Sequence, residues 1–283
     1  MVCTEGYGCT PKVAWIKAMN NLATSGAKVT GVRILMLLPV KEEESKIKTY
    51  AGEFNQLADE ANIQIMGGHT QVSEAYQRAS FVVNAFGLCG KYIQQPKEVK
   101  PGYQVVMTKW AGLMGSDLLA SAKQTELSSR LAQSYIKGGK FDSGDYSVSK
   151  EAQLCSKLGD NVCYMHDVSC GGVYGALWQL GSKLGKGLCI DHYKIPIRQE
   201  TIEFCEIFDL NPYMMEGTGS LLLVARDGQG IVDELMAAGI NAAVIGEVTS
   251  SKERVVVLGD SEEKRFLAPA KGDEIYKIEG VLC

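Results

Sequence analysis

A strand that ends in a carboxylate, a hydroxyl and two glycines lies in the middle of the chain and constrains its fold most. Residues 163–182 read Cys-Tyr-Met-His-Asp-Val-Ser-Cys-Gly-Gly and continue into a helical stretch. Apolar residues recur in that stretch at spacings of three and four, as in a helix packed on a sheet: Val173, Ala176, Leu177, Leu180 and Leu184. Glycines let a backbone approach a ligand closely, and the first N–H groups of a helix point outward at the positive end of its dipole. The segment predicts either an anion-binding corner with Asp167 exposed beside it, or a plain helix cap followed by a glycine turn.

The composition predicts a soluble globular protein and argues against several functions. Hydrophobic residues make up 46% of the 283 residues and charged residues 22%, enough for a core in one large or two ordinary domains. The net charge of −4 argues against binding to nucleic acids or to anionic membranes. No apolar window reaches the ~18 residues that a membrane-spanning helix needs.

The cysteines indicate a reducing compartment. The chain has nine, an odd number, and none forms a Cys-x-x-Cys pair. This pattern argues against a disulfide framework and against a structural zinc site. The first ten residues lack the basic start and the apolar stretch of a secretory signal. We therefore expect a cytoplasmic protein.

Helical and strand patterns alternate along the chain and predict a two-domain α/β or α+β protein. In the first half we expect helices over 19–27 and 41–62 and strands over 31–38, 63–66 and 80–88, with Gly67–Thr70 as a turn. A linker over 96–102 predicts a boundary between domains 1–98 and 99–283, the second ending in a tail over 268–283. Three strands form a thin sheet with an exposed edge and an apolar face, so we expect a partner chain to cover it.

Several segments, in order, resemble the AIR synthetase superfamily over roughly residues 11 to 250. They include Asn-Asn-Leu-Ala-Thr-Ser-Gly-Ala at 20–27, Gly-Gly-His-Thr at 67–70, Thr-Lys at 108–109 and His-Asp-Val-Ser-Cys-Gly-Gly at 166–172. The segments Ile-Pro-Ile-Arg-Gln-Glu-Thr at 195–201 and Asn-Pro-Tyr at 211–213 make the hydrogenase-maturation dehydratase, with its AIR-synthetase-related cousins, the most similar branch.

This resemblance implies a fold, a reaction and a set of residues. The N-terminal sheet would pair across a homodimer, and a C-terminal α/β domain would follow. ATP and Mg²⁺ would be used to phosphorylate a carbonyl or amide oxygen, and a maturation-pathway protein or another small molecule would be the partner. Nucleotide binding would fall to nine residues: Asn20, Asn21, Gly67, Gly68, His69, Thr70, Lys109, Gly171 and Gly172. Catalysis would fall to three: Asp167, His166 and Cys283. The plain alternatives are a hydrogen-bonded core histidine at 166 and a surface lysine at 109.

Departures from the family pattern keep a second hypothesis open. The family usually begins with a further Gly-rich segment, so we expect this chain to be short at its start. Asn21 stands where relatives carry an aspartate, and His69 where some carry an acid; both changes remove an anionic oxygen that Mg²⁺ prefers. Glu5 and Asp117 are the replacements considered, and no metal ligand is assigned. The alternative function is a non-catalytic homodimer that works as a scaffold or as a sensor of a small phosphorylated ligand.

The final residue, Cys283, also has two interpretations. In the hydrogenase-maturation relatives a terminal cysteine receives a carbamoyl group, which ATP then helps to dehydrate to a thiocyanate. A thiol on a free tail can reach into a cleft, and its thiolate is the reactive form. However, the relatives' Pro-Arg-Ile before the cysteine is Gly-Val-Leu here. The residue is either a carrier or an ordinary terminal cysteine.

Overall fold

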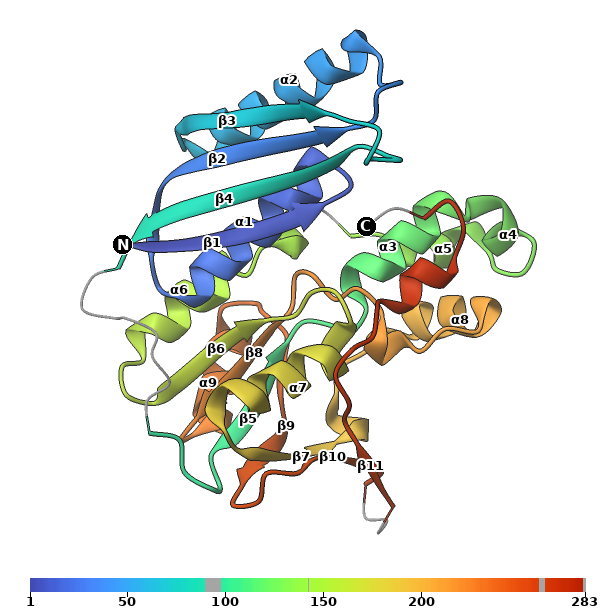
Figure 1. The fold of residues 1–283 in the computed structure, drawn as a ribbon. Helices are drawn as coiled ribbons and strands as arrows, with labels where there is room; N and C mark the ends of the chain where they lie inside the picture. The colour runs from blue at the N-terminus through green and yellow to red at the C-terminus, as the bar shows by residue number, and fades with distance from the viewer. Residues whose placement is uncertain (90–97, 142, 260–262, 282–283) are drawn as a thin grey trace. The chain divides into compact units, whose positions relative to one another are not determined.

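The computed structural model describes residues 1–89, 98–141, 143–259 and 263–281. These residues form two compact units, 1–89 and 98–281, each built around its own sheet (Figure 1). The linker expected over 96–102 falls partly on residues 90–97, which lie outside the described ranges. Within the described ranges, no helix combines the length and the apolar character that crossing a membrane requires.

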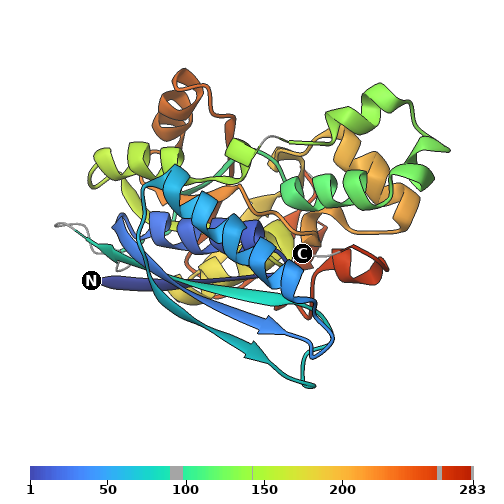
Figure 2. The same cartoon turned by 90° about the horizontal axis from the view of Figure 1, so that it is seen from above.

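The first unit is a four-stranded sheet with two helices on one face. Its elements in order are β1 (Val2–Gly8), α1 (Pro11–Thr24), β2 (Lys28–Leu38), α2 (Glu44–Ala61), β3 (Ile65–Val72) and β4 (Ser80–Leu88). The strands lie in the order β1-β4-β2-β3, and only β2 and β3 run parallel. Figure 2 shows α1 and α2, in blue, side by side on the sheet. Trp15 and Leu22 of α1 and Phe54 of α2 pack on β2 and β4 in the core.

The helix expected over 19–27 begins earlier, at Pro11, and ends at Thr24. Thr10 caps it, because its side chain accepts a hydrogen bond from the Val13 N–H, and Pro11 takes a first-turn position where no N–H is needed. A left-handed Gly26 (φ 68°) follows its end. The Thr10–Pro11 pair therefore marks the start of this helix, whereas apolar periodicity alone places that start too late.

The turn expected at Gly67–Thr70 is wrong, because these residues continue strand β3. The register between β2 and β3 shifts at Val32, so that Met66 is an extra residue on β3, and Gly67 beside it has φ 147°. A Cβ on Gly68 would lie 2.2 Å from the Ile34 carbonyl oxygen. The two glycines thus serve a bulge and a close approach of strands. The sheet also has a fourth strand, β1, which the sequence patterns did not reveal.

The second unit is a seven-stranded mixed sheet in the order β11-β10-β7-β9-β5-β8-β6. Its strands are β5 (Gln104–Thr108), β6 (Val162–Asp167), β7 (Gly187–Asp191), β8 (Leu221–Ala225), β9 (Ala242–Thr249), β10 (Arg254–Val257) and β11 (Lys264–Phe266). Its α-helices are α3 (Leu113–Ala122), α4 (Gln124–Ser128), α5 (Gln133–Gly138), α6 (Ser149–Lys157), α7 (Gly172–Leu184), α8 (Gln199–Phe208) and α9 (Gly228–Ala237). Four short 3-10 turns complete it: η1 (Ser143–Tyr146), η2 (His192–Lys194), η3 (Pro212–Met214) and η4 (Glu274–Lys277).

Helix α7 packs on this sheet through the stripe that the sequence predicted. Val173, Leu177 and Leu180 are buried among strand residues such as Leu222 and Ile245. The chain is thus mixed α/β with two sheets, as expected. Strand β6, at one edge of the sheet, leads straight into the corner that precedes α7.

Candidate functional site

The corner between β6 and α7 is a tight backbone turn that depends on two glycines. Gly171 and Gly172 both have left-handed backbones, with φ 85° and 64°. A Cβ on Gly172 would lie 2.5 Å from the Tyr213 carbonyl oxygen, so the turn η3 packs directly on the start of α7. The Ser169 carbonyl accepts hydrogen bonds from the N–H groups of Gly172 and Gly217, at 3.0 and 3.2 Å. These contacts hold the outward-pointing Gly171 N–H in a fixed position.

An anion is bound at this corner, and it comes from the chain itself. The Asp273 carboxylate accepts the Gly171 N–H at 2.7 Å through Oδ2. Its Oδ1 accepts the N–H groups of Glu216 and Ile275, at 3.0 and 2.9 Å. Asp273 is 4% exposed. The Gly171 N–H at the start of α7 thus holds a buried carboxylate together with the N–H groups of Glu216 and Ile275, in keeping with the preference of helix N-termini for anions.

Opposing effects act on the charge of the Asp273 carboxylate. Burial and the neighbouring Glu216 carboxylate together raise the pKa of the Asp273 carboxyl to about 6, although the three N–H donors act in the opposite direction. Glu216 is fully buried, and its Oε1 accepts hydrogen bonds from the Thr218 N–H and hydroxyl. Two acidic groups thus share one buried region, which disfavours having both charged.

The same region contains a group of side chains that could ligate a metal. Cys170, Glu216 and Asp273 each place one ligand atom within 4.8 Å of the others. However, both Asp273 oxygens already accept backbone N–H groups, and the positive end of the α7 dipole faces them. These surroundings favour an anion over a cation, so we assign no metal here.

Asp167 and His166 lie beside this corner at the end of β6. Asp167 is 7% exposed, so it is not the exposed carboxylate that the turn pattern predicted. His166 is half-buried, and its Nε2 lies 3.0 Å from Gln179 Oε1 on α7. His166 therefore contributes to the join between strand and helix, and Asp167 is a buried acidic residue next to it.

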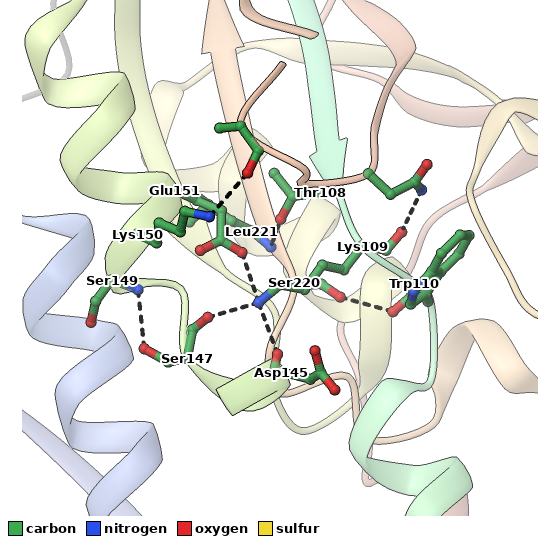
Figure 3. A network of polar contacts seen from close by, with 12 residues as sticks. Thr108, Lys109, Trp110, Asp145, Ser147, Ser149, Lys150, Glu151, Ser220 and Leu221 are labelled. Carbon is green, nitrogen blue, oxygen red and sulfur yellow. Dashed lines mark hydrogen bonds and ion pairs between the residues drawn. The ribbon is translucent and has the colours of Figure 1, made fainter. Parts of the chain in front are cut away.

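Lys109 is the centre of a second polar network, drawn in Figure 3. It follows β5 with a left-handed backbone, φ 54°, which is unusual for a lysine. Its Nζ lies 2.8 and 2.7 Å from the carbonyl oxygens of Asp145 and Ser147, and 2.7 Å from Glu151 Oε1. The Lys109 and Glu151 side chains are 14% and 2% exposed. The ammonium group already has three oxygen partners from its own chain, and so fastens segment 145–151 to the sheet.

A cavity of about 350 Å³ lies beside this network. Lys109, Trp110, Phe141 and Asn241 are among its lining residues. Lys150 lies at the same cavity, is exposed, and donates its ammonium to the Ala238 carbonyl at 2.9 Å. Aromatic, amide and cationic groups thus line one cavity.

The remaining predicted residues belong to the first unit or lie outside the described ranges. Gly67, Gly68, His69 and Thr70 line a mainly apolar cavity of about 270 Å³ between β2, β3 and α2. Asn20 is buried. Asn21 donates its amide to the Glu5 carbonyl at 2.9 Å, and the Glu5 carboxylate accepts the Asn84 amide at 3.0 Å. Cys283 lies outside the described residues.

Three residues that matter here carried no role in the sequence prediction. Asp273 and Glu216 build the corner, and Glu151 pairs with Lys109. Asp273 precedes the short helix η4 and accepts the Ile275 N–H, so its place in the sequence indicates only a cap of that helix. Glu151 lies on the buried side of a short helix and offers no signal at all.

Comparison with known proteins supplies the family. The model of the AIR synthase related protein C-terminal domain matches residues 100–259, and that of the N-terminal domain matches residues 11–89. A curated relative, the carbamoyl dehydratase HypE of Rhodobacter capsulatus, is 21% identical over 266 residues, covering 87% of this chain and 74% of the relative.

Solved structures share the fold. HypE of E. coli, described as a hydrogenase maturation protein, superposes with a TM-score of 0.79 at 20% identity, covering 96% of this chain and 86% of that one. A structure of the HypE–HypF complex has a TM-score of 0.75 at 18% identity, covering 94% of this chain and 89% of that one. A structure of HypE in complex with ATP has a TM-score of 0.74 at 15% identity, covering 94% of this chain and 84% of that one. The two domain models together cover most of the chain, which therefore belongs to the AIR synthase-related family.

Proposed function

We propose that this protein is an ATP-dependent enzyme of the hydrogenase-maturation type, which activates a carbonyl or amide oxygen by phosphorylation. The observation that carries the proposal is the buried carboxylate held by three backbone N–H groups at the corner before α7. Phosphate oxygens accept the same N–H groups as carboxylate oxygens do. The family and the similar proteins named above, a carbamoyl dehydratase and a structure with ATP, support the choice of reaction.

In this proposal the chain's own residues bind and orient the reacting groups. Gly171 presents its backbone N–H to a phosphate, and Gly172 permits the left-handed turn that follows. His166 ties the end of β6 to α7 through Gln179, and Asp167 comes next along the strand. ATP supplies a phosphoryl group that converts the substrate oxygen into a leaving group. Catalysis of this type consists mainly of positioning and of neutralising charge. We assign Lys109 to positioning segment 145–151, because its ammonium already has three partners.

The first unit would contribute to nucleotide binding through Asn20, Asn21 and the β3 residues Gly67–Thr70. An amide at Asn21 offers an oxygen but no charge, so we propose that Mg²⁺ enters with the nucleotide phosphates and keeps several of its waters. The Glu5 backbone carbonyl holds the Asn21 amide, and the Glu5 carboxylate accepts the Asn84 amide beside it. Cys283 would carry the carbamoyl group whose oxygen is activated.

We also propose that the protein is a cytoplasmic homodimer with a maturation-pathway partner. Four half-buried apolar residues, which alternate with core residues along β2 and β4, define the open sheet face: Leu35, Leu37, Val82 and Phe86. Leu35 and Val82 are register partners, so they share a face opposite the helices. A second copy would cover this apolar face. The HypE–HypF complex supports a protein partner, and no disulfide joins any two of the described cysteines.

Calorimetric titration of the full chain with ATP and Mg²⁺ tests the function first, and phosphate release with a carbamoylated thiol tests it second. We expect Asp167→Asn to lower turnover by about a hundredfold, as loss of a positioning charge at a phosphate site does. Asp233→Asn is the matched control, since Asp233 is exposed on α9 and accepts the Gln229 amide of its own helix. No heat at millimolar ATP would refute the proposal. Binding without turnover would favour the scaffold or sensor function.

Mass spectrometry of the C-terminal peptide tests the role of Cys283. After incubation with a carbamoyl donor and ATP, we expect a mass increase on the wild-type peptide that is absent from Cys283→Ser. An unmodified peptide under conditions where the enzyme turns over would remove the carrier role and leave the ATP-dependent reaction standing.

A further inference from the structure

The C-terminal segment 270–278 is docked on the corner before α7 by contacts from four of its residues. The Asp273 carboxylate accepts the Gly171 N–H, and the Glu274 carboxylate accepts the Asn211 N–H at 3.0 Å. The Tyr276 hydroxyl lies 3.5 Å from Cys170 Sγ, and a Cβ on Gly171 would lie 2.7 Å from that of Ala270. In Figure 1 the red C-terminal trace passes the first turn of α7. The segment therefore covers the corner.

The central contact has the chemistry of ligand recognition. Three backbone N–H groups, from the start of α7, from the loop before β8 and from η4, converge on one carboxylate. Two of them come from parts of the chain far from Asp273; Gly171 is 102 positions away. Two of these donors, the Gly171 and Glu216 N–H groups, lie outside the segment and would remain for an external anion at the same corner.

The docked carboxylate is also in an unfavourable place for a charge. Glu216, from the loop before β8, and Cys170, from the loop before α7, each place a ligand atom within 4.8 Å of it. Within the described ranges, Asp273 accepts three backbone N–H groups and forms no ion pair with a cationic side chain. Burial and Glu216 raise the pKa of this carboxyl. Part of the energy of the hydrogen bonds is thereby offset, which makes the contact displaceable.

We propose that segment 270–278 is a self-blocking strap, in which Asp273 occupies the position of an external phosphate group and must leave before that group binds. The inference rests on the proposed function, because it takes the corner before α7 as the place of the nucleotide phosphates. Ligand binding and release of the strap are then one coupled event. The affinity measured in the wild type is the intrinsic affinity reduced by the fraction of molecules with the strap released.

Hydrogen exchange and calorimetry on the full chain, with ATP and Mg²⁺ as the probe, test the strap. In the wild type we expect ATP to speed exchange of the amides over 273–281 and to slow exchange over 169–175. Asp273→Asn removes the charge at nearly constant shape, and Asp273→Ala removes the side chain. We expect both to bind ATP about tenfold more tightly than the wild type, a difference of ~1.4 kcal/mol. Glu279→Gln is the control: it removes an exposed charge directly after the segment and should leave affinity unchanged.

The outcomes separate the strap from the function. If ATP binds the wild type and both variants equally, and exchange over 273–281 does not change, the strap is refuted and the proposed function stands. If neither the wild type nor either variant binds ATP, the proposed function fails and the strap fails with it. If only one variant folds, as judged by its thermal melt, that variant alone is compared with the wild type.

Discussion

The buried pair of Lys109 and Glu151 allows a sharp prediction about the stability of the second unit. Replacing Lys109 by methionine keeps most of the side-chain volume but leaves the Glu151 carboxylate, 2% exposed, without its cation. It also removes the donor that binds the Asp145 and Ser147 carbonyls. Breaking a buried pair on one side costs about 3–5 kcal/mol, because an uncompensated charge remains buried. We therefore expect Lys109→Met to lower the free energy of unfolding by about 4 kcal/mol.

The reverse change should cost less. Glu151→Gln leaves the Lys109 ammonium with its two carbonyl partners, so we expect a loss of about 1–2 kcal/mol. The double variant Lys109→Met/Glu151→Met removes both charges and should recover most of the stability lost by Lys109→Met alone. The difference between the double variant and the sum of the single variants gives the coupling energy.

Urea unfolding followed by tryptophan fluorescence measures these effects in the correct unit. Trp110 and Trp178 belong to the second unit and Trp15 to the first, so a Trp15→Phe background makes the signal report on the second unit alone. Lys194→Met is the control, since the Lys194 side chain is 63% exposed in its pair with Asp191 and should cost under about 0.5 kcal/mol. The reasoning is refuted if Lys109→Met costs under about 1 kcal/mol, or if the double variant is no more stable than Lys109→Met.

Three further predictions concern other parts of the chain. In β3, Gly68→Ala should destabilise the first unit by about 2 kcal/mol or more, because the new Cβ meets a β2 carbonyl. In α2, Gly52→Ala has open space around the new Cβ and should stabilise the unit by about 0.5–1 kcal/mol. Urea unfolding followed by the fluorescence of Trp15, the tryptophan of the first unit, compares the two variants. The pKa of Asp273 is raised by burial to about 6, so its contribution to stability is present below its unfolded value of 3.8 and is lost as the pH rises through about 6. The stability of the wild type relative to Asp273→Asn should therefore fall by about 2 kcal/mol between about pH 4.5 and 7, and a pH-independent difference would contradict this. Finally, Leu35→Glu on the open sheet face should shift sedimentation from dimer to monomer, while Val40→Glu, at an exposed site outside that face, should not; an unchanged dimer would remove the proposed interface.

Sequence patterns predicted elements well where the signal was local and periodic. The predictions of the apolar stripe of α7 and of the apolar strand before it were correct. Burial of one helix face gives apolar residues at spacings of three and four, and a short buried strand gives a short apolar run. The prediction failed at Gly67 and Gly68, where glycines that serve a bulge and a close strand contact were taken as a turn. Glycine marks an unusual backbone, and the neighbour that requires it is known only from the fold.

The predicted site residues were located with unequal success. The chemistry of the corner at Gly171 could be anticipated, because a strand, a glycine pair and a helix start are consecutive in the chain. The partners of Lys109 could not, since Glu151 lies on a separate helix and the two carbonyls belong to an irregular turn. A lysine at the end of a strand is equally compatible with a phosphate and with an internal ion pair until its neighbours are known.

By itself, the sequence determined that this chain alternates strands and helices and that a strand–glycine–helix corner able to bind an anion lies at residues 167–172. Backbone dihedrals and side-chain periodicity are local properties, and a short stretch of residues is enough to express them. Only the tertiary structure decided which anion sits at that corner. Asp273 reaches the Gly171 N–H across 102 positions, and such a contact depends on how the sheet and its connections bring distant segments together.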